Sequence, residues 1–148
     1  MIKSIFQKLL NRSGKNYSID PNIPEKLIFY TLCKRGIMLI RGFLKTGRKV
    51  FVGQHTKIYN PGNIVFGQSV TIDKYCTIDG FSSEKIVLGH CSKIGAFSTL
   101  SSTSHFSKYG KGVKIGNNSA MGQFCEIGAA GGIEIGNDVI MGSYISFH

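Results

Sequence analysis

Apolar residues recur every six positions along most of this sequence, and small residues follow them. In the stretch VKIGNNSAMGQFCEIG, the pairs Ile115-Gly116, Met121-Gly122 and Ile127-Gly128 are each six residues apart. A strand buries every second residue and a helix about every 3.6th, so neither element alone produces this period. The hexad positions cover residues 46–148 in five groups of three: Thr46, Val52, Ile58; Phe66, Ile72, Ile78; Leu88, Ile94, Leu100; Ile115, Met121, Ile127; and Ile135, Met141, Phe147.

A chain that turns a corner every six residues closes a triangle after three sides. Each side is then a very short strand, and successive coils stack as parallel strands about 4.8 Å apart. Glycines and the pairs Asn117-Asn118 and Asn137-Asp138 are expected at corners that need unusual backbone angles. An antiparallel sandwich would show strict alternation and hairpin turns instead. The sequence therefore predicts an all-β domain over residues 46–148, a parallel β-helix of about five triangular coils.

A second, modest side chain follows four residues after most hexad positions, which predicts a small inward slot at each turn. Cys76 and Cys125 occupy two of these slots. The four cysteines of the chain form no C-x-x-C pair and show no zinc spacing. We therefore expect reduced, buried cysteines that pack as small hydrophobes, and we expect no metal site.

Every break in the period follows the third hexad of a group. There the step lengthens from six residues to between eight and fifteen. The extra residues are therefore expected to leave the prism at one shared corner, and the longest insertion is the loop 101–114. Loops on a rigid scaffold are where binding and catalytic residues gather, so this corner is the predicted functional edge.

The final stretch, GVKIGNNSAMGQFCEIGAAGGIEIGNDVIMGSYISFH, resembles the hexapeptide-repeat acyltransferases. It is most similar to the O-acetyltransferases that modify bacterial surface polysaccharides and sugars. The resemblance implies left-handed coils, a homotrimer, and acetyl-CoA bound in the groove between neighbouring prisms. It also implies an acceptor that is a sugar or a lipid-linked sugar, and a histidine that acts as the general base.

A histidine base suits this chemistry because an imidazole with an ordinary pKa of about 6.5 removes a proton at neutral pH. In the family the base lies in the loop after a third hexad. His148 stands at the start of such a loop and is the candidate catalytic base or its neighbour. His105 and Lys111, in the long loop of the same corner, are candidate substrate-binding residues. The alternative for each is an ordinary solvated loop residue.

The chain stops where the family's base is expected. We expect that base a few residues beyond His148, followed by further coils and a cap, so the chain is interpreted as truncated. Two other functions therefore stay open: a catalytically inactive trimeric scaffold, and a zinc hydratase of the carbonic-anhydrase type. The hydratase would need three converging histidines, and His90, His105 and His148 show no matching spacing.

Residues 1–45 do not follow the hexad rule and are predicted to form a separate, basic, helical segment. Residues 1–49 contain 11 of the 18 lysines and arginines but only two of the eight acidic residues, and the whole chain has a net charge of +10. Pro21 and Pro24 divide the segment into two predicted helices, at about 2–12 and about 24–45.

The longer predicted helix is basic and amphipathic. Lys34, Arg35, Arg41 and Lys45 fall on one side of a helical wheel, and most apolar residues fall on the other. Such a helix can lie on an anionic membrane surface, or its apolar face can cap the open first coil. The basic segment matches no familiar nucleic-acid-binding module. The first residues carry too much charge for a secretory signal, so we expect a cytoplasmic protein, peripheral at the inner face of the membrane if the helix binds lipid.

Overall fold

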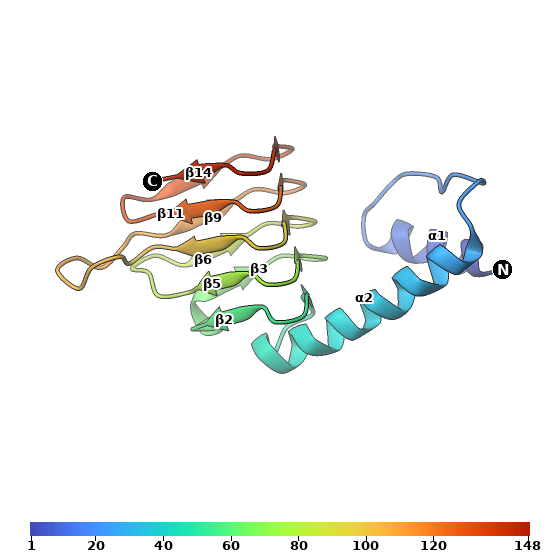
Figure 1. Ribbon diagram of the computed structural model, residues 1–148, viewed down its shortest axis with the longest axis horizontal. Coiled ribbons are helices and arrows are strands. Elements are labelled where there is room, and N and C mark those ends of the chain that lie inside the picture. The colour runs from blue at the N-terminus through green and yellow to red at the C-terminus, as the bar shows by residue number, and fades with distance from the viewer.

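The computed structural model describes all 148 residues. Two helices, α1 (Ile2–Arg12) and α2 (Glu25–Thr46), precede a stack of short strands (Figure 1). One 3₁₀ turn, η1 (Pro61–Asn63), lies between the second and third strands. The strands are β1 (Phe51–Val52), β2 (Lys57–Tyr59), β3 (Ile64–Phe66), β4 (Thr71–Ile72), β5 (Thr77–Asp79), β6 (Ile86–Leu88), β7 (Lys93–Ile94), β8 (Thr99–Ser101), β9 (Val113–Ile115), β10 (Ala120–Met121), β11 (Glu126–Gly128), β12 (Ile133–Ile135), β13 (Ile140–Met141) and β14 (Ser146–Phe147).

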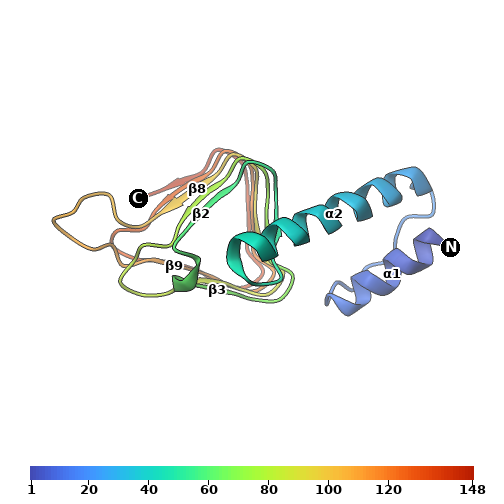
Figure 2. The ribbon, with the colours of Figure 1, turned by 90° about the horizontal axis from the view of Figure 1, so that it is seen from below.

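The strands form three parallel sheets, which are the three sides of a triangular prism (Figure 2). The first sheet contains β1, β4, β7, β10 and β13; the second contains β2, β5, β8, β11 and β14; the third contains β3, β6, β9 and β12. The chain thus makes four complete coils and two sides of a fifth. In Figure 2, which looks along the prism from its β2 end, the path runs counter-clockwise as it recedes, so the coils are left-handed. The predicted β-helix is confirmed.

The hexad residues fill the interior in columns, as their period predicted. In the second sheet, Leu100 is in register with Ile78 on one side and with Ile127 on the other. All three side chains have no exposed surface, and they belong to one cluster of 18 buried residues. Because apolar burial stabilises a fold by about 25 cal/mol per Å², these columns are the main source of stability in the prism.

The small side chains four residues after the hexad positions fill the inward slots, and two of the serines among them also pair with corner backbone groups. Ser98 Oγ donates to the carbonyl of Gly122 in the next coil and accepts from the N–H of Cys125. Ser119 repeats both contacts with the coil that follows it. A hydroxyl fits the slot and satisfies two backbone groups that burial would otherwise leave without partners.

The cysteine prediction is confirmed at two positions and wrong at two. Cys76 and Cys125 are buried in inward slots. Burial raises the pKa of the Cys76 thiol, so this group stays protonated and unreactive. Cys33, however, is exposed on α2, and Cys91 is only partly buried at a corner. The period describes only the inward positions of the prism, and neither Cys33 nor Cys91 occupies one.

Close approach between coils, and not backbone angle, explains most of the repeat's glycines, which corrects the expectation from the sequence. Apart from Gly47, which ends α2, no glycine that follows a hexad residue has a positive φ. A Cβ on Gly95 would collide with the carbonyl oxygen of Gly122 in the next coil. Adjacent coils therefore touch backbone to backbone at this corner, and only glycine leaves them room.

Left-handed backbone angles instead occur at non-glycine residues, among them Asn118 and Asp138 as the sequence predicted. Five further residues with left-handed angles lie along the corner between the first and second sheets, and their rings stack in one column with centroids 4.9 to 5.2 Å apart. This aromatic ladder consists of His55, Tyr75, Phe97, Phe124 and Tyr144. A left-handed conformation costs a non-glycine residue roughly 1–2 kcal/mol. Each stacked pair contributes about 0.5–1.5 kcal/mol, so the ladder offsets much of this strain.

The C-terminal part of α2 packs against the end of the prism where edge strand β1 has no preceding coil, and the rest of the helix extends away from the prism (Figure 1). Met38 and Gly42 are buried there, and a Cβ on Gly42 would collide with the carbonyl of Val50. Thr46, which the period assigned to the first hexad, is the last residue of α2. The helix thus takes the place of a strand in the third sheet, which has four strands where the other two have five.

Two arginines that the helical wheel placed on the basic side of the helix, opposite most apolar residues, point toward the prism. Arg41 Nη1 donates to the carbonyl of Val52 at 2.7 Å, and Arg35 Nη1 donates to Thr71 Oγ1 at 3.0 Å. The end of a strand stack leaves carbonyl groups without a neighbouring strand, and Arg41 pairs with one of them at Val52, whereas Arg35 pairs with a side-chain hydroxyl. The wheel ranks residues by polarity alone, so it could not show these partners.

The outer face of α2 leaves large apolar side chains in solvent. Ile40 is 64% exposed, Phe43 is 59% exposed and Leu44 is 80% exposed. The helix therefore has two apolar faces, of which one caps the prism, as one of the two alternatives predicted, and the other is uncovered. Neither helix combines the length and hydropathy that a membrane crossing requires.

Candidate functional site

All four insertions leave the prism at the corner between the second and third sheets, which we call the loop corner (Figure 2). They comprise residues 60–63, 80–85, 102–112 and 129–132. The common edge that the spacing predicted is confirmed. The reason is geometric, because an insertion placed at the same point of each coil emerges at the same angle around the prism axis.

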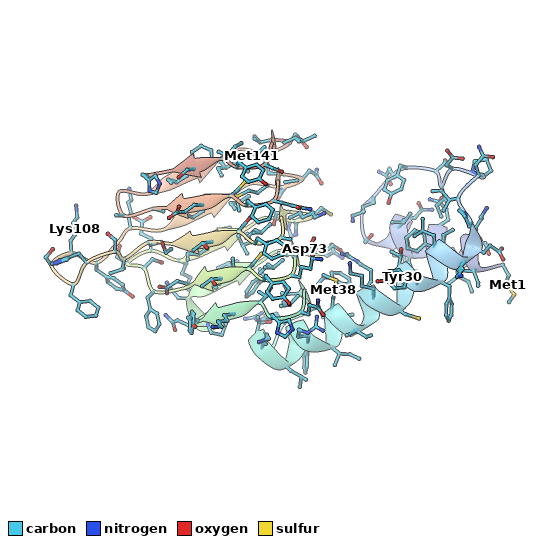
Figure 3. All side chains as sticks on the ribbon, in the orientation of Figure 1. Met1, Tyr30, Met38, Asp73, Lys108 and Met141 are labelled. Atoms are coloured by element: carbon cyan, nitrogen blue, oxygen red, sulfur yellow. The ribbon has the colours of Figure 1, made fainter.

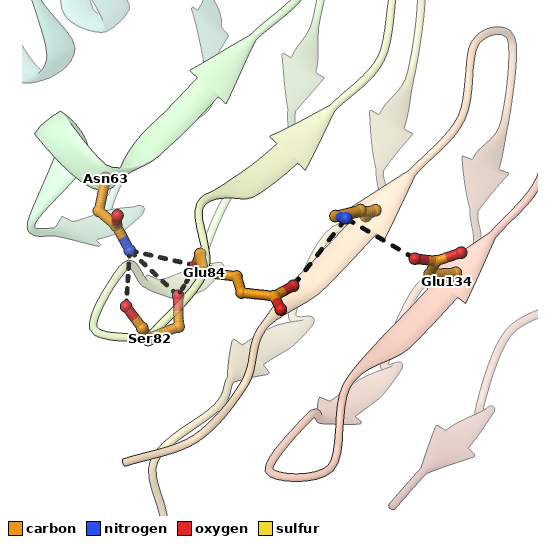
Figure 4. A network of polar contacts seen from close by, with 5 residues as sticks. Asn63, Ser82, Glu84 and Glu134 are labelled. Atoms are coloured by element: carbon orange, nitrogen blue, oxygen red, sulfur yellow. Dashed lines mark hydrogen bonds and ion pairs between the residues drawn. The ribbon is translucent and has the colours of Figure 1, made fainter.

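A polar network joins neighbouring loops at the loop corner (Figure 4). Asn63 Nδ2 donates to the hydroxyl and carbonyl oxygens of Ser82 at 3.1 Å each, and Ser82 Oγ donates to the carbonyl of Glu84 at 2.6 Å. On the third sheet, Lys114 Nζ lies 3.9 Å from a carboxylate oxygen of Glu84 and 3.7 Å from one of Glu134. Lys114 therefore forms ion pairs with two acids, which join neighbouring coils of the prism.

His148 lies at the loop corner of the last coil, directly after β14. Its Nε2 atom is 2.6 Å from Ser146 Oγ. Its Nδ1 atom lies over Gly128 of the preceding coil, 3.0 Å from where a Cβ of that residue would stand. The hydroxyl holds the exposed ring in one orientation, and the absence of a side chain at position 128 leaves room for it.

Lys111 borders the turn 129–132 from the preceding coil. Its backbone N–H donates to the carbonyl of Ala130 at 3.0 Å, and its methylene chain covers Gly132. No carboxylate pairs with its ammonium group. His148 lies over Gly128, the residue just before this turn, and Lys111 covers Gly132 at its end. The structure therefore places Lys111 and His148 on opposite sides of one short segment.

His105 lies in the loop 102–112, whose tip projects away from the prism near Lys108 (Figure 3). Its Nδ1 atom is 2.8 Å from Ser107 Oγ and accepts from the Ser107 N–H at 3.1 Å. An isolated antiparallel β-bridge between the backbones of His105 and Lys108 closes the tip. The imidazole is thus held within its own loop, apart from the turn that Lys111 and His148 share.

This arrangement provides an exposed imidazole, an unpaired ammonium group and a backbone turn at one edge of a rigid prism. An imidazole can remove a proton from a hydroxyl group, and an ammonium group can bind an anionic substituent. No group of three or more histidine, cysteine, aspartate or glutamate side chains could hold a metal ion.

The sequence analysis did not identify the aromatic ladder. Its signal is present, because an aromatic residue or histidine stands three positions after Val52, Ile72, Ile94, Met121 and Met141. The rings stack face to face within the column, although Tyr144 at its end is 77% exposed, and the ladder is therefore a packing device.

No family model matches this sequence. A UDP-3-O-acylglucosamine N-acyltransferase from Campylobacter curvus is 33% identical over 94 residues, which make up 61% of this chain and 25% of that protein. The chain thus spans about a quarter of the length of this curated relative. Among solved structures, it is similar to serine acetyltransferase isoform 3 of Entamoeba histolytica, with 18% identity and a TM-score of 0.46 over 99% of this chain and 59% of the other.

The six-residue period and the structure agree on one architecture, three parallel sheets around a column of hexad side chains. The identity of 33% to an acyltransferase adds a sequence relationship to this shared pattern. Together, the repeat, the triangular coils and this relative make the chain similar to acyltransferases in sequence, on a parallel β-helix with a six-residue period.

Proposed function

We propose that this protein transfers an acetyl group from acetyl-CoA to a sugar hydroxyl, in the synthesis of a cell-surface polysaccharide. The observation that carries the proposal is the exposed imidazole of His148 at the loop corner, across a short turn from the unpaired ammonium group of Lys111. The similar N-acyltransferase is named for an acylated glucosamine carried by UDP, which supports a sugar as acceptor.

In the proposed reaction, His148 is the catalytic base. Its imidazole takes the proton of the acceptor hydroxyl while the hydroxyl oxygen attacks the thioester carbonyl carbon. The carbon–sulfur bond then breaks, and the imidazolium gives its proton to the leaving thiolate. The products are an acetyl ester and free coenzyme A, so no covalent intermediate with the protein is required.

We assign substrate binding to Lys111 and His105. The Lys111 ammonium group has no acidic partner, so it is free to meet a phosphate or an acidic group of the acceptor. His105, at the projecting tip of the long loop, reaches a more distant part of the acceptor. The active assembly is a homotrimer, with acetyl-CoA in each groove between neighbouring prisms.

Acetyl transfer is tested with the purified protein, acetyl-CoA and a panel of neutral, acidic and phosphorylated sugars. We expect a mass in solution of three chains, one acetyl-CoA bound per chain, and a gain of one acetyl group by at least one sugar. Hydroxylamine should remove this group, because it cleaves esters readily and leaves amides. Mass spectrometry and release of the coenzyme A thiol measure the reaction.

Coenzyme A without its acetyl group is the matched control, since it retains every part of the donor except the thioester. A protein that binds neither acetyl-CoA nor coenzyme A would be a scaffold. An acetylated product that resists hydroxylamine would point to N-acetylation and would overturn the assignment of a hydroxyl acceptor.

We also propose that α2 holds the protein at the inner face of the cell membrane. Its outer apolar side chains are exposed, and lysines flank them on the same helix. Replacing Ile40 and Leu44 together by glutamate is expected to reduce binding to phosphatidylglycerol vesicles at least tenfold, because two charges would enter the lipid interface. Vesicle flotation measures this, and Val65→Glu, at an exposed site on the prism, is the control. Equal flotation of both variants would refute the contact.

A further inference from the structure

A cavity of about 840 Å³ lies between the two helices and the prism. Figure 2 shows that the helices lie on the side of the prism away from the loop corner. Its walls come from α1, the connector that follows it, the middle of α2, and the corner between the third and first sheets. Its size is typical of sites for drug-sized ligands and cofactors. Nothing in the proposed acetyl transfer uses this cavity.

The cavity lining has five cationic side chains and no carboxylate: Arg12, Lys15, Arg35, Arg48 and Lys49. None of the five takes part in an ion pair. Asp73, whose charge acts on Arg35, lies outside the lining, and its carboxylate accepts from the N–H of Lys74. No carboxylate in the lining therefore pairs with the positive charge of the cavity.

Two of the five cations, Lys15 and Arg35, are partly buried, which disfavours their charged forms. Burial lowers the pKa of Lys15 below its ordinary value, and the positive charges of Arg35 and Lys93 lower it further. Burial likewise lowers the pKa of Arg35. Cations that are close together, partly desolvated and without acidic partners are stabilised by a bound anion.

The rest of the lining includes an apolar wall contributed by both helices: Phe6, Leu9, Leu10, Leu32 and Leu39. On the prism side, the guanidinium carbon of Arg35 lies 3.6 Å from the centroid of the Phe51 ring. This contact and the hydrogen bond to Thr71 fix the plane of the guanidinium group. A fixed, forked donor is suited to phosphate oxygens, and the leucine wall is suited to a hydrocarbon chain.

We propose that this cavity binds a phosphate-bearing amphiphile, a phosphate or diphosphate ester whose other end is an apolar chain. The five cations supply the charge that such a headgroup needs, and the apolar wall supplies a surface for its chain. A neutral glycolipid would leave the cations unpaired, and a small inorganic anion would leave the wall in water. The shared chemistry covers both a membrane lipid and a soluble phosphate ester.

Decyl phosphate, used below its micelle concentration and titrated into the full chain by calorimetry, tests this proposal. We expect one site per chain, with affinities at least tenfold lower for decyl maltoside, butyl phosphate and inorganic pyrophosphate. The double variant Arg48→Gln/Lys49→Gln should weaken the binding of decyl phosphate at least tenfold, since it removes two of the five cationic side chains that line the cavity. Vesicles that contain phosphatidic acid compete with decyl phosphate if the source is a membrane lipid and do not compete if it is a soluble ester.

The matched control is Lys57→Gln/Lys85→Gln, which removes the same charge from exposed positions outside the cavity. Arg48 and Lys49 are also exposed, so circular dichroism and the unfolding midpoint should be unchanged in both double variants. The proposal is overturned if the cavity variant binds decyl phosphate as tightly as the unmodified chain. It is also overturned if decyl maltoside or pyrophosphate matches decyl phosphate.

Discussion

Replacing His148 by asparagine is expected to lower the rate of acetyl transfer by about 10²- to 10⁴-fold, the usual contribution of a positioned general base. Asparagine retains the size and polarity of the side chain, but it cannot take a proton from a hydroxyl group. The ring of His148 is exposed, and its only side-chain partner is Ser146, so the fold should be unaffected. Steady-state rates at saturating acetyl-CoA measure the loss, and acetyl-CoA affinity should change little.

His55→Asn is the matched control for this substitution. His55 is also an exposed histidine, and its φ of 58° is one that asparagine adopts readily. It lies on the aromatic ladder, at a different corner of the prism from His148. We expect its rate to stay within about twofold of the unmodified protein. If His148→Asn were equally active, the base would have to be sought elsewhere.

Truncation of Leu100 to alanine is expected to reduce the free energy of unfolding by about 2–5 kcal/mol. Leu100 has no exposed surface, and its neighbours in the column, Ile78 and Ile127, are equally buried. The backbone contacts between coils prevent the column from closing around the lost methyl groups, so the cavity should persist. Urea unfolding followed by circular dichroism measures the change.

Val65→Ala provides the comparison, because Val65 is the central residue of β3 but is 43% exposed. Its side chain points away from the columns, so a loss of less than about 1 kcal/mol is expected. Similar losses at both positions would mean that the interior columns do not dominate the stability of the prism. A loss confined to Leu100 would support the structural argument.

Two features of the N-terminal region could not be inferred from the sequence. The helical wheel placed Arg35 and Arg41 on the basic side of the helix, opposite most apolar residues, yet both donate hydrogen bonds to the prism. The five cations of the cavity come from α1, its connector, α2 and the segment before β1, and only packing of these parts brings them together. A local sequence pattern cannot predict where these side chains lie, because their positions depend on how the two helices dock against the prism.

The candidate site was predicted in part. The spacing located the loop corner, because identical coils place equal insertions at equal angles. It did not show which lysines near this corner have acidic partners. Lys114 lies between two acids from adjacent coils, whereas Lys111 has no acidic partner. That difference depends on which strands lie beside β9, and the six-residue period does not specify which charged residues those strands place next to Lys114.

By itself, the sequence determined the number of sides of the prism, the residues that fill it and the corner that carries the loops. These properties follow from the six-residue period, because each coil repeats the same spacing of inward residues regardless of its neighbours. Only the tertiary structure decided where the helices dock and which arginines they turn inward. Those outcomes depend on contacts between coils and between helix and coil, where unpaired carbonyls and backbone clashes select one arrangement.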